Sequence, residues 1–231
     1  MKTKAFSILV LAIFLACGND DEQQDDNRMT YSYEFSADTE GWIGDFADYP
    51  AGEEENYGLE FGHSPLPAPL DNTQGSLKLS GRNHSDDLFM FVMKQITGLT
   101  PDHEYQLNFE VEFATDVADG QFGIGGSPGE SVYVKAGASG IEPEKEEDEL
   151  GWYRLNIDKG NQSTDGENMI VIGNYANGTD ENVYTLKTLS TSTPMRVTSS
   201  SAGSIWLLFG TDSGFEGETT IYINKIEVEL F

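Results

Sequence analysis

Apolar and polar side chains alternate along most of the chain after residue 28. The clearest alternation is in YQLNFEVEFAT, residues 105–115, where aromatic and aliphatic side chains occupy every second position and mostly amides or carboxylates lie between them. Such a run predicts a β-strand with one face in a core and the other in water. Comparable runs bounded by turn residues predict further strands at residues 31–35, 76–81, 87–96, 131–136, 152–157, 168–175, 183–189, 204–210 and 219–230.

About ten strands with no helical period between them predict an all-β fold, a two-sheet β-sandwich or jelly roll. In residues 219–230 the apolar positions change parity near Asn224 and Lys225, which indicates either a β-bulge or a strand buried on both faces. The sequence shows no internal repeat, and we expect no second hydrophobic core. A single domain over residues 29–231 follows as the simplest organisation.

The chain begins with a segment of a different kind. Two lysines precede a largely apolar run, residues 5–16, which ends directly before Cys17. At about 1.5 Å per residue this run is too short to cross a bilayer core, and its charged start and small final residue are typical of a secretory signal. The alternative is a helical anchor that is never cleaved. Cys17 is the only cysteine in the sequence, so the domain after it can form no internal disulfide.

The residues around Cys17 carry a resemblance of their own. FLAC resembles a bacterial lipobox, and the acidic run GNDDEQQDD is similar to the surface-export signal of Bacteroidetes lipoproteins, although a solvated tether has the same composition. The resemblance implies a lipoprotein signal peptide over residues 1–16 and an acidic tether over residues 17–28 behind a lipidated Cys17. We therefore expect the protein in the cell envelope, lipid-anchored and exposed at the outer-membrane surface.

Acidic residues outnumber basic ones: 40 Asp and Glu stand against 13 Lys and Arg, a formal net charge of −27. This balance excludes nucleic acid as a partner, because nucleic-acid binding depends on basic side chains that neutralise phosphates. It also disfavours contact with anionic lipid headgroups, which leaves the lipid chain as the membrane contact. The surplus of carboxylates suits calcium, a hard cation that prefers oxygen ligands, and it suits solubility equally.

Three segments share a pattern: YEFSADTEGW at residues 33–42, the run from GSLKLSGR to NFEVEF at residues 75–113, and TTIYINKIEVEL at residues 219–230. Together they resemble jelly-roll carbohydrate-binding modules of the xylan- and glucan-binding kind, with a galactose-binding-like β-sandwich. The resemblance implies that fold and non-catalytic glycan binding. These modules often hold a structural calcium at positions where this chain has Ser36 and Asn224, so that particular calcium site is not expected here.

GIGGSPGESVYVKAGAS, residues 123–139, contains two patterns associated with catalysis. Ser127 lies in Gly-x-Ser-x-Gly, but Pro128 follows it and has no backbone N–H to line an oxyanion hole. YVKAG resembles the YFKAG strand of alginate-lyase-type jelly-roll enzymes, yet Ala138 stands where their catalytic tyrosine does, and the accompanying histidine motif is missing. We expect a turn followed by a strand and no catalytic residue. Lys135 is expected either to orient an acidic group of a ligand or to be a plain strand-edge lysine.

Two polar loops and one tryptophan are the candidate ligand contacts. GRNHSDD at residues 81–87 and NIDKGNQSTDGEN at residues 156–168 carry amides and carboxylates suited to sugar hydroxyls, although such residues also form ordinary turns. Trp152 shares the polar face of its strand with Arg154, either as a platform for a sugar ring or as a rim residue. The predicted ligand-binding residues are Trp152, Asn83, Asp86, Lys135, Asn161 and Gln162, and the predicted calcium ligands are Asp86, Asp87 and Asp38.

These observations predict a surface-anchored lipoprotein whose β-sandwich binds glycan without catalysis. One alternative is a structural or adhesion sandwich with no small ligand. The other is an enzyme similar to the jelly-roll polysaccharide lyases. Exposed aromatics beside amide clusters favour the first interpretation, a smooth polar surface the second, and a cleft with a paired acid and base the third.

Overall fold

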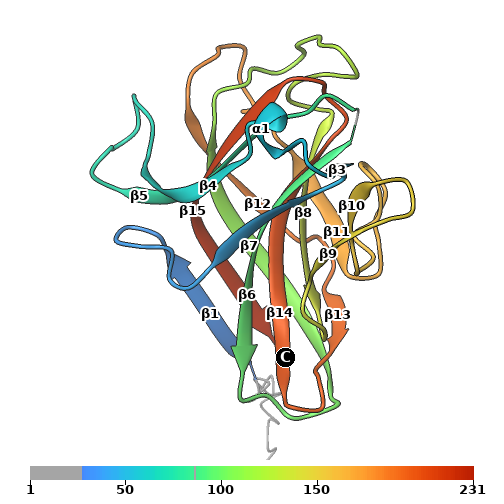
Figure 1. The fold of residues 1–231 in the computed structure, drawn as a ribbon. Helices are drawn as coiled ribbons and strands as arrows, with labels where there is room; N and C mark the ends of the chain where they lie inside the picture. Colours follow the sequence, from blue (N-terminus) through green and yellow to red (C-terminus); the bar gives the residue numbers. More distant parts are fainter. Residues whose placement is uncertain (1–27, 86) are drawn as a thin grey trace, which may run out of the picture.

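The computed structural model describes residues 28–85 and 87–231 of the chain (Figure 1). The signal peptide predicted over residues 1–16, the lipidation site Cys17 and the tether up to residue 27 lie outside the described residues, as does Asp86. Within the described ranges, no helix has the length and the apolar character needed to cross a membrane.

Strands dominate the described structure, and they are joined by turns and loops. The elements in chain order are β1 (Met29–Glu34), β2 (Ile43–Ala47), β3 (Tyr49–Pro50), α1 (Glu54–Tyr57), β4 (Glu60–Pro65), β5 (Gly75–Arg82), β6 (Leu88–Thr97), β7 (Glu104–Thr115), β8 (Val132–Ser139), β9 (Lys145–Glu147), β10 (Trp152–Leu155), β11 (Met169–Asn174), β12 (Thr185–Ser190), β13 (Met195–Thr198), β14 (Ser204–Ser213) and β15 (Glu218–Leu230).

Two antiparallel sheets form the body of the molecule (Figure 1). The seven-stranded sheet has the order β12-β7-β15-β5-β4, with β1 paired to β15 and β13 paired to β7. The five-stranded sheet has the order β11-β8-β14-β6-β2. The predicted all-β, two-sheet sandwich is therefore confirmed. A third, three-stranded sheet of β3, β10 and β9 is an addition that the hydrophobic pattern did not predict.

The main core lies between the two large sheets and follows the alternation of the sequence. In β7, Leu107, Phe109 and Val111 are buried, while the polar residues between them point away. In β14, Leu207 and Phe209 meet them from the five-stranded sheet as members of the same cluster. Burial of this apolar surface is the main stabilising contribution to the sandwich.

The parity change in the last strand is a β-bulge. Ile223 pairs with Phe113 and Lys225 pairs with Glu112, so Asn224 is the extra residue in β15. Because of the extra residue, the apolar side chains before and after Asn224 point to the same face of the sheet. The apolar residues before and after it are all buried in the main core, namely Ile221, Ile223, Ile226, Val228 and Leu230.

The five-stranded sheet is also covered on its outer face, which corrects the expectation of a single core. Phe89, Phe91 and Leu208 point away from the main core and form a second cluster with Ile157. Residues 140–168, which include β9, β10 and a long loop, supply the cover over this face. Trp206, which the apolar run SIWLLF places in the core, instead packs half-buried against the second cluster.

Candidate functional site

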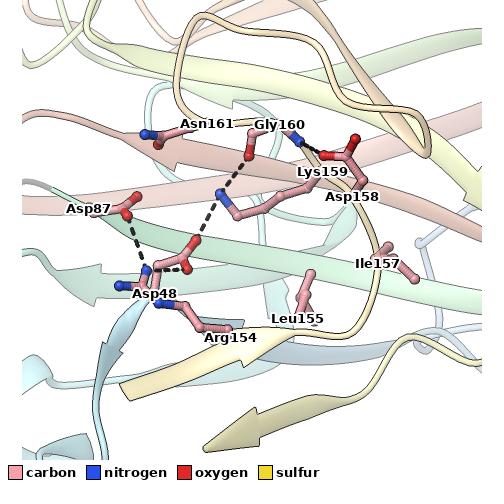
Figure 2. Close-up of a pocket in the computed structure, with 9 residues that line it drawn as sticks. All are labelled: Asp48, Asp87, Arg154, Leu155, Ile157, Asp158, Lys159, Gly160 and Asn161. Carbon is pink, nitrogen blue, oxygen red and sulfur yellow. Dashed lines mark hydrogen bonds and ion pairs between the residues drawn. The ribbon is translucent and has the colours of Figure 1, made fainter. Parts of the chain in front are cut away.

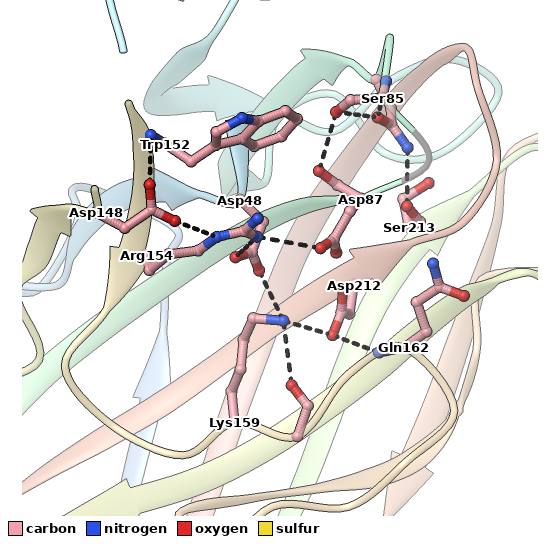
Figure 3. Close-up of polar contacts among 12 residues, drawn as sticks. Asp48, Ser85, Asp87, Asp148, Trp152, Arg154, Lys159, Gln162, Asp212 and Ser213 are labelled. Atoms are coloured by element: carbon pink, nitrogen blue, oxygen red, sulfur yellow. Dashed lines mark hydrogen bonds and ion pairs between the residues drawn. The ribbon is translucent and has the colours of Figure 1, made fainter. Parts of the chain in front are cut away.

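Six charged side chains meet on the outer face of the five-stranded sheet. Figure 3 shows five of them, all except Lys135. An outward position on an interior strand usually faces water, but here residues 140–168 lie over it. Lys135, Asp212, Asp48 and Lys159 are therefore buried, while Asp87 and Arg154 are partly exposed, and all six charges are paired with one another. The group is called the charged network below. Its members are Asp48, Asp87, Lys135, Arg154, Lys159 and Asp212.

Lys135 lies in the interior of the charged network. It projects from the central strand β8, and its Nζ is 3.1 Å from Oδ2 of Asp212 in β14, with both side chains fully buried. The same ammonium donates to the backbone carbonyls of Lys159, at 2.8 Å, and Thr164, at 3.0 Å. Burial lowers the pKa of Lys135, and Asp212 opposes this shift. Lys135 therefore ties the covering loop to the sheet, which corrects both the expected ligand contact and the strand-edge alternative.

Lys159 bridges two carboxylates of the charged network. Its Nζ lies 2.7 Å from Oδ2 of Asp48 and 2.9 Å from Oδ2 of Asp212. The ammonium also lies over the ring of Phe89, 4.9 Å from its centroid, which is a favourable cation–π distance. Asp48 reaches this position because its left-handed backbone, with φ of 62°, ends β2, and its N–H donates to the carbonyl of Tyr153.

Arg154 is the most exposed member of the charged network. Its Nη1 lies 2.6 Å from Oδ1 of Asp48 and 3.2 Å from Oδ2 of Asp87. The guanidinium lies over the ring of Trp152, 5.0 Å from its centroid. Asp148 fixes this pair, because its Oδ1 accepts the N–H of Trp152 and its Oδ2 lies 3.5 Å from Nε of Arg154. Trp152 and Arg154 thus form a fixed platform at the edge of the network.

Asp87 is the titratable member of the charged network. Burial, followed by the neighbouring carboxylate of Asp48, raises its pKa to about 6, against the lowering influence of Lys159 and Arg154. Its Oδ1 is buried and has no hydrogen-bond partner among the described residues. A carboxyl group of this kind takes up a proton in mildly acidic solution.

A pocket of about 390 Å³ opens beside the charged network (Figure 2). The side chains and backbone around it are mostly polar, and two aliphatic side chains from the end of β10 and the following loop contribute an apolar part. Its lining residues are Asp48, Asp87, Arg154, Leu155, Ile157, Asp158, Lys159, Gly160 and Asn161.

The loop that forms one wall of the pocket is ordered by its own hydrogen bonds. Asp158 accepts the N–H of Gly160 at 2.9 Å and that of Glu167 at 3.0 Å, which lowers the pKa of Asp158. Gly160 has a φ of 68°, and a Cβ there would lie 2.1 Å from the carbonyl oxygen of Thr164, so a glycine is required. The wall is therefore preformed.

The predicted ligand-binding residues divide into two groups. Asn161 lines the pocket, and Trp152 lies beside it, against the lining residue Arg154. Gln162 follows Asn161, and its N–H donates to Oδ2 of Asp212 at 2.9 Å. Asn83 is elsewhere: it is 2% exposed, and its amide donates to the carbonyls of Ser213 and Phe215. Asn83 therefore holds two chain segments together, which corrects its expected role as a ligand contact.

The predicted calcium ligands lie in different parts of the structure. Asp87 lies with Asp48 and Asp212, and one carboxylate oxygen from each lies within 4.8 Å of the others. Three cations, Lys135, Arg154 and Lys159, already face these three carboxylates. Asp38 belongs to a different place, where its Oδ1 accepts the N–H of Glu40 at 2.7 Å, and Asp86 is outside the described residues.

The calcium prediction has a direct measurement. An ion that binds the folded state alone raises stability with its concentration, so the melting temperature is expected to be higher in calcium than in EDTA. Asp87→Asn should abolish the difference, because it removes one carboxylate charge from the predicted set. Superimposable melting curves in calcium and in EDTA would rule the ion out.

The stretch from Gly123 to Ser139 forms a turn and a strand, as predicted. Oγ of Ser127 accepts the N–H groups of Gly129 and Glu130, each at 3.2 Å, and also bonds to the carboxylate of Glu130. The serine therefore closes the turn before β8. This arrangement is a turn cap, and Pro128 after the serine has no N–H for the oxyanion hole of a nucleophile elbow.

Four members of the charged network, Asp48, Arg154, Lys159 and Asp212, were not among the predicted site residues, and two of them lie outside every segment singled out as polar. Asp48 is a single polar residue between Ala47 and Tyr49, and Asp212 comes three positions after Phe209, the last residue of the apolar run of β14. The available signal was the parity of Asp212, which shares a face with Trp206 and Leu208. A charge on a face that is otherwise apolar indicates a buried partner, and that partner comes from a distant segment.

Comparisons with known proteins found structural similarity only. No family model and no curated protein matches the chain. The fold is similar to the K1 cleaved adhesin domain of Lys-gingipain from Porphyromonas gingivalis W83, at 12% identity over 87% of this chain and 97% of that one, with a TM-score of 0.38. It is similar to TmCBM27, a carbohydrate-binding module with specific mannan recognition, at 9% identity over 87% and 97%, with a TM-score of 0.37.

A third similar structure is a putative sugar binding protein from Bacteroides thetaiotaomicron VPI-5482, at 10% identity over 84% of this chain and 89% of that one, with a TM-score of 0.40. All three similarities are distant, so the function has to be argued from the residues of this chain. The pocket and the platform of Trp152 and Arg154 are the features that bear on it.

Proposed function

We propose that the protein binds glycan without transforming it, through the pocket beside the charged network, while a lipid at Cys17 holds it at the cell surface. The observation that carries the glycan proposal is the fixed platform of Trp152 and Arg154 at the edge of a preformed polar pocket. Protein sites for sugars combine an aromatic ring with a few oriented hydrogen-bonding groups, and this pocket offers both.

The chemistry around the platform suits sugar hydroxyls. Arg154 and the amide of Asn161 can donate hydrogen bonds, and the carboxylates of Asp48 and Asp87 can accept them. The charges inside the pocket are largely balanced, which favours a neutral sugar. A shallow site of this kind is expected to bind weakly, with a dissociation constant on the order of micromolar to millimolar.

The test is binding to a panel of polysaccharides by affinity electrophoresis. Trp152→Ala is expected to weaken retention in the gel relative to the wild type, because it removes the aromatic ring that lies beside Arg154. Ser127→Ala and Leu150→Ala are the controls, since Ser127 closes a distant turn and Leu150 is an exposed apolar neighbour of Trp152. Retention by Trp152→Ala at the level of the wild type would contradict the proposed site.

A polysaccharide-cleaving enzyme is the second candidate, and one observation favours it. Asp87, with its pKa raised to about 6, lies beside the carboxylate of Asp48, and paired carboxylates of unequal pKa can serve as acid and base in glycoside hydrolysis. The salt bridges of both groups to Arg154 support binding instead. Release of reducing ends or unsaturated sugars by the purified protein would favour the enzyme.

The lipid anchor has its own test. Cys17 follows an apolar run and precedes an acidic one, which supports lipidation there. Cys17→Ala is expected to move the protein from the membrane fraction to the soluble fraction, and radiolabelled palmitate is expected to label the wild type alone. A wild type that takes up no label in its host would contradict the anchor, whatever the result for glycan.

A further inference from the structure

A second polar hollow lies on the opposite side of the sandwich, on the outer face of the seven-stranded sheet. It has a volume of about 470 Å³ and spreads over β4, β5 and β15, next to α1. The charged network contributes nothing to it, because that network lies over the five-stranded sheet. Its lining residues are Asn56, Tyr57, Gly58, Glu60, Lys78, Ser80, Arg82, Tyr184, Glu218, Thr220 and Tyr222.

Two half-buried tyrosines form one side of this hollow. Tyr222 projects outward from β15, and Tyr184 lies just before β12. Their ring centroids are 5.6 Å apart, with the rings at 89° to each other, so each ring holds the other in place. A fixed tyrosine at the side of a polar hollow presents an apolar ring face and a hydroxyl together, which is the combination that a sugar ring requires.

The floor of the hollow is built from strand positions in register. Glu60, Ser80 and Thr220 lie directly across from one another on β4, β5 and β15. The hydroxyls of Ser80 and Thr220 are 2.7 Å apart and form one hydrogen bond. The single bond uses one hydroxyl hydrogen, so the pair keeps further capacity to donate and accept.

The charges of the hollow are balanced in pairs. Nζ of Lys78 lies 2.7 Å from the carboxylate of Glu60, and Arg82 lies 3.2 Å from that of Glu218. In a chain with a net charge of −27, a surface with equal numbers of cations and anions is distinctive. An anionic ligand would have to compete with two carboxylates, and a cationic one with two basic groups. The balance therefore favours a neutral ligand rich in hydroxyls.

The hollow continues along the sheet. A neighbouring hollow of about 500 Å³ shares Glu60 and Lys78 with it and extends past Gly62 to His63 and Ser64. Gly62 lies opposite Lys78, and a Cβ at Gly62 would meet no heavy atom within 4 Å. The two hollows adjoin at Glu60 and Lys78, and Gly62 projects no side chain into the second of them. Together they are called the groove below.

We propose that this groove is a second binding site, for a neutral oligosaccharide, with Tyr222 as the stacking platform and Ser80, Thr220 and Lys78 as hydrogen-bonding groups. The site is independent of the pocket on the five-stranded sheet. A chain with one site on each face binds two strands of a polymer, or two polymers, at once, and gains affinity from the pairing.

The experiment uses the full chain carrying Trp152→Ala, so that binding at the first pocket cannot mask the second. The probes are β-linked hexasaccharides of glucose, xylose and mannose, with a hexauronate as the charged comparison. Titrations followed by amide NMR are expected to shift the signals of Gly62, Thr220 and Tyr222 with at least one neutral probe, and to leave them in place with the hexauronate.

Two substitutions test the groove itself. Tyr222→Ala is expected to weaken binding roughly fivefold to tenfold through the lost ring face. Gly62→Ile is expected to weaken it by about tenfold or more, because it places a branched side chain in the groove at a position where a Cβ meets no heavy atom within 4 Å. Thr30→Ile places the same side chain on β1, on the same outer face but outside the groove, and should bind as before.

The outcomes separate the two sites. Neutral-probe binding that survives Gly62→Ile, or no binding of any neutral probe in the Trp152→Ala background, overturns the second site. Binding that is lost in Gly62→Ile but kept in Thr30→Ile supports it. Both results are obtained within the Trp152→Ala background, whereas the first pocket is tested by comparing the wild type with Trp152→Ala, so the two proposals can fail separately.

Discussion

Replacing Lys135 with methionine is expected to lower the free energy of unfolding by about 3 kcal/mol or more, because it leaves a buried charge short of its partner. Asp212 would keep Lys159 as a counter-ion, but it would lose the ammonium that lies 3.1 Å away in a fully buried pair. The carbonyls of Lys159 and Thr164 would also lose their shared donor. The covering loop should then loosen from the sheet.

Urea denaturation of the two proteins measures this effect. The matched control is Arg196→Met, which breaks the exposed pair of Arg196 and Glu104 and should cost less than about 1 kcal/mol. Hydrogen exchange should rise in the loop that follows β10 in Lys135→Met and stay unchanged in the control. A loss for Lys135→Met as small as that of the control would show that the buried pair contributes little.

Asp87 is expected to give the protein a component of stability that falls as the pH rises. Its pKa is raised to about 6 in the folded protein, above the ordinary value of 3.8, so between these values the folded state binds more protons than the unfolded state. The contribution is therefore complete below about pH 4 and lost above about pH 6. A shift of about two units corresponds to roughly 3 kcal/mol at most.

The measurement compares wild type with Asp87→Asn across this range. Carboxylates with lowered pKa values, such as Asp148 and Asp158, contribute the opposite trend to both proteins and cancel in the difference. The stability of the wild type relative to Asp87→Asn should fall by up to about 3 kcal/mol from pH 4 to pH 7. A constant difference across that range would contradict the raised pKa.

The strands could be predicted because each is indicated by the alternation of neighbouring residues in the sequence. Alternation in residues 105–115 marks β7, and the parity change near Asn224 marks the bulge in β15. Both features depend on neighbours along the chain, and period-two patterning reports them directly. The open alternative for the last strand was settled by register, which pairs Ile223 and Lys225 with adjacent residues of β7.

The charged network could not be predicted because its members come from segments that are distant in the sequence. Asp48, Lys135 and Asp212 come from three separate strand regions, and each resembles an ordinary polar residue in its own segment. Their meaning depends on residues 140–168 lying over the outer face of the five-stranded sheet. The acidic composition of residues 140–168 gives no indication that this segment covers a sheet. Lys135 was therefore interpreted as a surface side chain, although its partner Asp212 lies 77 positions away in the sequence.

The pairing of β1 with β15 has a mechanical consequence for an anchored protein. The chain enters β1 at Met29, beside Leu230 near the end of β15, and the two strands stay antiparallel up to Glu34. A pull transmitted through residue 28 along the strand loads all six residue pairs in parallel, as shear, so the ladder cannot open one pair at a time. Under the proposed anchor at Cys17 and the proposed glycan binding, drag on a bound polymer would load this first strand in shear.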